Sequence, residues 1–114
     1  MAVRNAVAQD FVDSRIITWS GLLNGDSGDQ QGFLASGDKS VQFNGTFGVG
    51  GTIVFEGSND GLNWFVLTDL QTVAISKTAA ALEGIAEATL YVRPRVTAGD
   101  GTTSIIATMV VRQK

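Results

Sequence analysis

The chain of 114 residues contains no cysteine and no histidine, and it has a single proline. The absence of cysteine excludes disulfides, thiol nucleophiles and thiolate-bound metals or iron–sulfur clusters. The absence of histidine removes the usual general base near neutral pH, histidine-ligated metals and switching by imidazole protonation. The sequence therefore predicts a protein that is not an enzyme, with no catalytic, cofactor-binding or metal-binding residues.

Charged residues are also scarce, and the acidic ones predominate. There are 11 acidic and 8 basic residues, which leave a formal net charge of −3. Such a chain lacks the clustered Lys and Arg that bind a phosphate backbone, so we expect no direct contact with nucleic acid. No run reaches the ~20 apolar residues that span a bilayer. Polar residues such as Arg4 and Asp10 interrupt the first segment, where a signal peptide would be apolar. We expect no membrane contact and synthesis in a cytoplasm.

Turn residues and short β-forming runs make up most of what remains. The 14 glycines help to separate runs in which apolar and polar residues alternate with period two, as in a half-buried strand. Residues 78–88 are the one segment where a helical turn or two competes with a strand, because alanines dominate it. The strands expected from the pattern are 15–20, 32–36, 40–47, 51–56, 63–68, 72–76, 88–96 and 102–112.

The strand predicted over 88–96 has two distinct faces. Val92 and Val96 share one face, whereas Arg93 and Arg95 share the other. Pro94 has no N–H to donate to a ladder, so we expect this part of the strand to lie at an edge or a bulge.

The strand predicted over 102–112 is apolar on both faces. Ile105 and Met109 lie on one face, and Ile106 and Val110 lie on the other. A solvated face is normally more polar than this. The pattern therefore predicts either a central strand or a contact with another chain.

Seven or eight short strands, spaced about 8–12 residues apart, are typical of an antiparallel sandwich or barrel. We predict an all-β protein with a single antiparallel β-sandwich that is jelly-roll-like. An immunoglobulin-like sandwich is the alternative, although its Cys–Trp–Cys signature is absent. Residues 1–14 are predicted to form an irregular N-terminal arm, and residues 15–114 the sandwich domain.

Acidic residues are the candidates for metal binding or hydrolysis: Asp26, Asp29 and Asp38, Glu83 with Glu87, and Glu56 with Asp60. Calcium favours carboxylates from flexible loops, but each of the three aspartates follows a glycine in an ordinary turn sequence. Paired carboxylates hydrolyse glycosides when a deep cleft holds them at the right separation. We interpret the aspartates as turn residues and the pairs as solvated surface.

The candidate interface or ligand-contact residues are Trp64, Tyr91, Arg93 and Arg95. A stripe of arginines beside a tyrosine suits binding of a carboxylate or phosphate, stacking on a sugar, or pairing across a subunit interface. A polar solvent face, with arginine stems covering apolar surface, is the competing interpretation. Alternation over residues 63–67 predicts that one of Trp64 and Phe65 points into the core.

The stretch Val54–Leu67 reads VFEGSNDGLNWFVL. Its Asp60-Gly61 pair between two strand-like runs predicts a hairpin turn. The arrangement strand–EGSNDGxNW–strand resembles a hairpin of discoidin-like carbohydrate-binding β-sandwiches, and also one of small all-β virion proteins of tailed bacteriophages. The sequence YVRPRV at 91–96, the ending at 103–112 and the short length make the chain more similar to the phage group.

This resemblance implies a capsid decoration (cement) protein on the outer surface of the virion. It implies binding to the major capsid protein, stapling of neighbouring capsid subunits, and a homodimer or homotrimer that matches local capsid symmetry. The N-terminal arm is then expected to order on binding. The alternatives are a carbohydrate-binding or adhesin module, or a tail or neck component of the phage.

Overall fold

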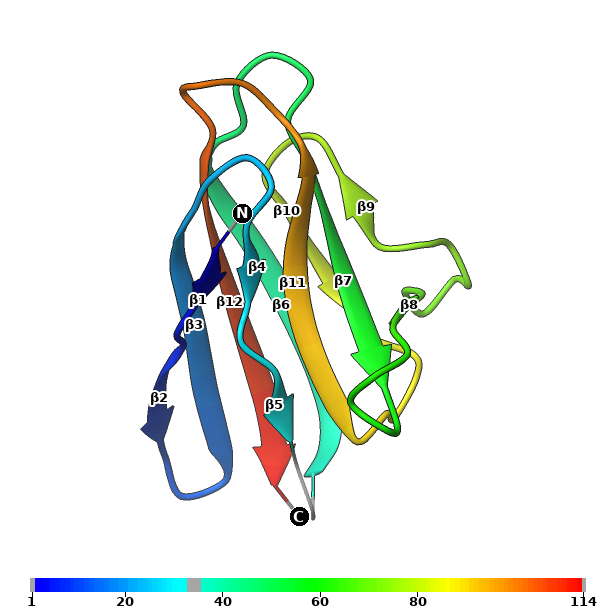
Figure 1. Ribbon diagram of the computed structural model, residues 1–114. Coiled ribbons are helices and arrows are strands. Elements are labelled where there is room, and N and C mark those ends of the chain that lie inside the picture. Colours follow the sequence, from blue (N-terminus) through cyan, green and yellow to red (C-terminus); the bar gives the residue numbers. More distant parts are fainter. Residues whose placement is uncertain (1, 33–35, 114) are drawn as a thin grey trace.

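The computed structural model describes residues 2–32 and 36–113 and shows two β-sheets packed face to face (Figure 1). Within these residues no helix is long and apolar enough to cross a membrane. The strands of the described residues are β1 (Val3–Arg4), β2 (Val7–Asp10), β3 (Ser14–Leu22), β4 (Ser27–Gly28), β5 (Gln31–Gly32), β6 (Ser36–Thr46), β7 (Thr52–Ser58), β8 (Phe65–Val66), β9 (Ser76–Lys77), β10 (Ala81–Gly84), β11 (Tyr91–Ala98) and β12 (Ser104–Gln113).

The strand order confirms the predicted sandwich. One sheet has five strands in the order β10-β6-β12-β3-β2. The other has seven strands in the order β1-β4-β11-β7-β8, with β5 beside β11 and β9 beside β7. Between β3 and β12 the chain passes repeatedly from one sheet to the other, and the pairs among the long strands are antiparallel. This repeated crossing gives the sandwich its jelly-roll-like connectivity.

The core lies between the sheets and centres on three aromatic rings. Trp19, Phe43 and Phe55 have no exposed surface, and they come from β3, β6 and β7. The rings of Trp19 and Phe55 meet edge to face, with centroids 6.1 Å apart, and Phe43 packs on Phe55 at 6.5 Å. Edge-to-face contacts of this kind add to the free energy gained by burying each ring.

The faces predicted for the last two strands are confirmed. Val92 and Val96 of β11 are buried, as are Ile105 and Met109 of β12. The apolar second face of this strand predicted either a central strand or a contact with another chain. The central strand is confirmed, because β12 lies between β6 and β3 in the middle of its sheet. That second face is on the outside of the sandwich, where Ile106 is 38% exposed.

Pro94 is accommodated by a break in the neighbouring strand. β11 lies inside its sheet, paired with β7 on one side along its whole length and with β4 and β5 on the other. The two short strands bond with β11 at Arg95 and at Tyr91–Val92, so Pro94 falls in the gap between them. A residue without an N–H fits there because no ladder bond is required of it.

Three expected elements differ from the structure. Residues 78–88 contain the strand β10 and no helix, because this segment pairs with the edge of β6. The strand expected over 63–68 is reduced to β8, and the one over 72–76 to β9 at Ser76–Lys77 with a bridge between Thr68 and Ala74. The strand expected over 32–36 falls partly outside the described residues.

The segment predicted as an N-terminal arm lies along its own domain. β1 pairs in parallel with β4 of one sheet, and β2 pairs with β3 of the other. The buried carboxylate of Asp26 accepts hydrogen bonds from Ala2 N, Leu23 N and Arg4 Nε, at 3.0, 3.0 and 2.8 Å. Asp29 Oδ1 accepts from Ala6 N at 3.0 Å and from Trp19 Nε1 at 2.9 Å. These bonds tie the start of the chain to the core without a binding partner.

Gly28 is expected to tolerate no side chain. A Cβ at this position would lie 2.5 Å from Trp19 Cδ1 and 2.7 Å from Pro94 Cδ, both of them in packed rings. Gly28→Ala should lower the free energy of unfolding by about 2 kcal/mol, the usual cost of overpacking, measured by chemical denaturation. Gly101→Ala is the control, because a Cβ there meets no atom within 4 Å. An equal effect of both substitutions would contradict the packing described.

Asp26 is expected to link stability to acid pH. Burial opposes its ionisation, but the N–H donors of Leu23, Arg4 and Ala2 outweigh burial and hold the pKa of this carboxyl below its usual value. Its stabilising effect is therefore complete above the unfolded pKa of about 4 and is lost as the pH falls through the folded pKa. Asp26→Asn should cost about 1–2 kcal/mol at pH 7.

The difference between wild type and Asp26→Asn should shrink below about pH 4, as measured by denaturation at several pH values. Asp13→Asn is the control, because the Asp13 side chain is 72% exposed and its oxygen is 3.8 Å from Arg112. A difference that does not change with pH would mean that the charge of Asp26 is not what holds β1.

Candidate functional site

The outer face of the seven-stranded sheet carries a cluster of two arginines around one glutamate. Glu56 of β7 lies directly opposite Arg93 of β11 in the ladder. Arg93 Nε donates to Glu56 Oε1 at 3.1 Å, and Arg95 Nε and Nη2 donate to Oε2 at 3.0 and 2.9 Å. Glu56 is only 4% exposed. Its carboxylate thus has hydrogen bonds from two guanidinium groups, as a buried charge requires.

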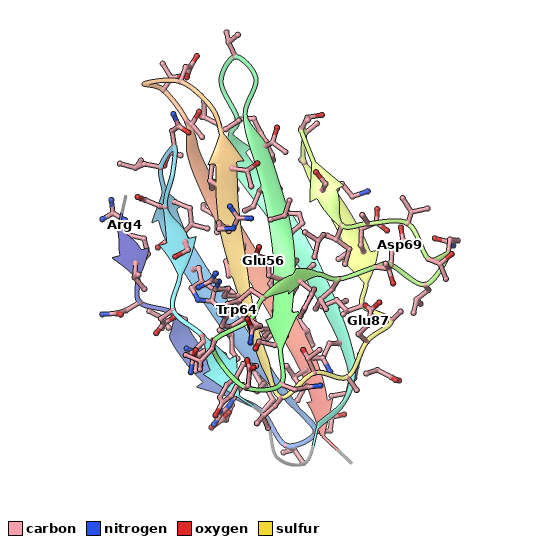
Figure 2. All side chains as sticks on the ribbon, turned by 45° about the vertical axis from the view of Figure 1, so that its right-hand side comes forward. Arg4, Glu56, Trp64, Asp69 and Glu87 are labelled. Carbon is pink, nitrogen blue, oxygen red and sulfur yellow. The ribbon has the colours of Figure 1, made fainter. Side chains whose placement is uncertain are left out.

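Trp64 covers this cluster from outside. The guanidinium carbon of Arg93 lies 4.1 Å from the centroid of the Trp64 ring, which is a cation–π contact. Figure 2 shows Trp64 and Glu56 close together over β7 and β11. Tyr91 lies on the same face of β11 as the arginines, with its ring against Gly32. The structure thus brings together all four predicted contact residues, and their role in binding a ligand stays a prediction.

The arrangement limits what this cluster can bind. One expectation for the arginine stripe was that it binds a carboxylate of a ligand. In the structure both arginines bind a carboxylate of the chain itself, that of Glu56. One face of the Trp64 ring is used by Arg93 and is not free to stack on a sugar. Two guanidinium groups against one carboxylate leave one net positive charge, on arginine side chains that are 26% and 39% exposed. The cluster therefore offers a weakly cationic surface patch.

The expectation that one of Trp64 and Phe65 enters the core is wrong. Trp64 is half-buried beside Arg93, and Phe65 is 70% exposed. The two side chains do alternate, but β8 lies at the edge of its sheet and only Leu67, two residues beyond Phe65, reaches the core cluster. Alternation alone does not predict Glu56 as the partner of the arginines, although an acidic residue after the apolar run Ile53–Phe55 is a visible signal of a buried ion pair.

The Asp60-Gly61 sequence makes a wider turn than the predicted hairpin. Asp60 Oδ1 accepts from the backbone N–H groups of Leu62 and Asn63, at 2.8 and 2.9 Å, and from Ser58 Oγ. Residues 59–64 therefore form a loop of their own between β7 and β8, with Gly61 at a φ of 76°. The motif that carries the family resemblance is thus a loop rigidified by side-chain hydrogen bonds.

The other acidic candidates also have structural partners. Glu83 forms an ion pair with Lys77 at 2.7 Å, and Glu87 accepts from Thr68 N and Oγ1 at 2.8 and 2.6 Å. Within residues 2–32 and 36–113, no three acidic side chains lie close enough together to hold a metal ion. Asp26 binds the start of the chain. These contacts make the acidic groups structural residues. The interpretation of the pairs as solvated surface is wrong for Glu56, which is buried and held by two arginines.

The outer face of the five-stranded sheet differs sharply from the cluster on the opposite sheet. Residues directly opposite each other in the ladder share a face, and along Ile106–Val110 of β12 the ladder brings together only uncharged side chains, with the charged Arg112 following at one end. Val7, Leu82 and Ile106 are 71%, 65% and 38% exposed. We call this surface the uncharged face, and it consists of Val7, Ile16, Thr18, Ser40, Gln42, Leu82, Ile106, Thr108 and Val110.

A depression of about 480 Å³ lies at one end of the uncharged face. Leu70 reaches it from the loop between β8 and β9 and packs against Gly84. A Cβ added at Gly84 would lie 2.9 Å from Leu70 Cδ1. Asp38 and Arg112 line the same depression beside Val110. Charge thus appears at the border of the uncharged face and not within it.

Comparisons with known proteins support the fold. No family model matches the chain, and no curated protein matches its sequence. The structure is similar to that of the SPBc2 prophage-derived protein YomS, with a TM-score of 0.67 and 10% identity, over 92% of this chain and 99% of that one. Peruvianin-I, a cysteine peptidase from Thevetia peruviana latex, gives a TM-score of 0.51 and 15% identity, over 90% of this chain and 52% of that one.

A cupin protein from Desulfovibrio desulfuricans gives a TM-score of 0.48 at 10% identity, over 94% of this chain and 82% of that one. At such identities the likenesses to YomS and Peruvianin-I are ones of fold. The likeness to the peptidase brings no thiol chemistry, because this chain has no cysteine. The likeness to YomS extends over almost the whole of both chains, so a sandwich of this kind also occurs in a prophage-derived protein.

Glu56 is expected to stabilise the fold through the arginine cluster. Glu56→Gln should lower the free energy of unfolding by about 2 kcal/mol, because charge-assisted bonds weaken and the two arginines, which are partly hydrated, lose their counter-ion. Tryptophan fluorescence should change as well, since Arg93 no longer holds its position over Trp64. Denaturation followed by fluorescence measures both effects.

The control for Glu56→Gln is Asp10→Asn, which breaks the exposed ion pair of Asp10 with Arg15. Exposed pairs contribute little, so the unfolding midpoint should hardly move. If Glu56→Gln is as mild as this control, the cluster is not a stabilising element.

Proposed function

We propose that this chain is a structural virion protein of a tailed bacteriophage, namely a capsid decoration protein. In this role it binds the outer surface of the head and staples neighbouring major capsid subunits. It acts by contact and not by catalysis.

The observation that carries the proposal is the uncharged face. Its central strand, β12, is apolar on both sides although only one side meets the core. A contiguous outer surface without charges is typical of a surface that another protein covers. We assign this face to the major capsid protein.

The fold of a prophage-derived protein and the EGSNDG loop both support a phage origin. The net charge of −3 suits a protein on the outside of a DNA-filled head better than one that contacts the packaged DNA. Many weak contacts of identical copies on a lattice add up to strong binding by avidity. A homodimer or homotrimer at the local symmetry axes is the assembly that this lattice favours.

Binding to heads that lack the protein tests the proposal. Purified protein should co-sediment with such heads and raise the temperature at which they release DNA. Val110→Arg adds a charge to the uncharged face, opposite Ile16 and Ser40, and should weaken binding more than about tenfold, as buried unpaired charges do.

Val49→Arg is the matched control. Val49 is 82% exposed at the turn between β6 and β7, outside the uncharged face, so this variant should bind like the wild type. Equal binding by Val110→Arg would remove the uncharged face as the contact. Association with purified tails and not with heads would replace the decoration role by that of a tail or neck component.

A further inference from the structure

A cleft of about 350 Å³ opens at the end of β7, away from the arginine cluster. It lies between the loop that follows Ser58, the strand β8 and the segment around Glu87. Figure 2 shows Glu87 beside the chain that leads from β8 towards Asp69. The volume is at the lower end of the range of small-molecule sites, roughly 300–1,000 Å³.

Phe65 provides the cleft with an exposed aromatic surface. It is 70% exposed, although the adjacent Trp64 is half-buried on the opposite side of the chain. Leu67, which is buried, and Val66, which is 40% exposed, extend the apolar lining. An aromatic ring left in water next to a concave surface can gain free energy by covering a ligand.

The polar side chains of the cleft are held in place by bonds within the chain. Thr68 N and Oγ1 hold both oxygens of Glu87, and the turn N–H groups hold Asp60. Asn59 Oδ1 accepts from Leu90 N at 3.0 Å. Among the described residues, no bond engages the Nδ2 group of Asn59, which is left to donate to a ligand. Fixed donors and acceptors of this kind lose little entropy when a ligand binds.

The charges of the cleft select for a ligand that is not anionic. N–H groups of Asn63 and Leu62 hold the pKa of Asp60 well below its usual value. Burial opposes the ionisation of Glu87, but the bonds from Thr68 outweigh it and lower the pKa of that carboxyl. Both groups are therefore ionised near neutral pH, and the lining residues include no Lys or Arg. A carboxylate or sulfate on the ligand would be repelled.

We propose that this cleft binds a neutral saccharide. The apolar face of a sugar ring lies on Phe65, and its hydroxyl groups accept from Asn59 Nδ2 and donate to the carboxylates of Asp60 and Glu87. Sugars combine one apolar face with a ring of hydroxyl groups, which is the chemistry that this lining complements. The site differs from the cluster of Trp64, Tyr91, Arg93 and Arg95, and it does not depend on the decoration role.

A glycan panel tests the proposal with the full chain. The panel holds neutral oligosaccharides of glucose, galactose, mannose and N-acetylglucosamine, with sialylated and sulfated glycans for comparison. We expect binding of at least one neutral member and none of the anionic ones. Titration of isotope-labelled protein with the bound sugar should shift the amide signals of Gly57, Asn59, Phe65 and Thr89 most.

Variants then locate the contact. Phe65→Ala should weaken binding about tenfold or more, since it removes the stacking surface, whereas Phe65→Tyr should retain it. Asn59→Asp keeps the acceptor for Leu90 N but loses the Nδ2 donor, and it should also weaken binding. Leu62→Ala is the matched control, because Leu62 is 83% exposed in the same loop but does not line the cleft.

Phe65 is exposed, so its variants should melt like the wild type, and loss of binding can then be assigned to the site. The proposal is overturned if no neutral sugar binds up to about 10 mM, or if Phe65→Ala binds as well as Leu62→Ala. It is also overturned if the shifted signals lie around Tyr91 and Arg93. Failure of any of these tests leaves the head-binding experiment unaffected, because that experiment probes the opposite sheet.

Discussion

The pairing of β7 with β11 is the constraint on which the rest of the molecule depends. β7 is buried on both faces: Phe55 joins the aromatic core, and Glu56 lies beneath two arginines on the outside. Since neighbouring residues of a strand point to opposite faces, a register shift of one residue would expose the ring and bury the carboxylate without partners. The Arg93–Glu56–Arg95 cluster therefore disfavours such a shift of register.

The same pairing separates the surfaces of the protein by chemistry. On the outer face of the seven-stranded sheet, Trp64 lies over the arginine cluster, and the end of β7 leads into the cleft of Phe65. The outer face of the five-stranded sheet is uncharged along Ile106–Val110 of β12. In the proposed roles, the uncharged face attaches the protein to the capsid, and the cleft on the other sheet binds its ligand.

The alternation of side chains made much of the fold predictable. Val92, Val96, Ile105 and Met109 are buried as their spacing predicts, because period two follows directly from strand geometry. The candidate cluster was half predictable: Tyr91, Arg93 and Arg95 share a face by alternation. Their partner Glu56 is distant in the sequence, and only the ladder register brings it opposite Arg93. The inward position expected for Trp64 or Phe65 is wrong, because an edge strand has no second sheet to cover each side chain.

The sequence by itself determined the all-β class, the two faces of the long strands and the exclusion of thiol and imidazole chemistry. Each of these follows from residue identity or from local geometry, which one segment expresses without its neighbours. Tertiary structure decided that the first residues are tied to Asp26 and Asp29, that Pro94 fits a gap between two short strands, and that the EGSNDG loop forms the wall of a cleft. These features rest on contacts between segments far apart in the chain, and such contacts exist only once the strand order and register of both sheets are established.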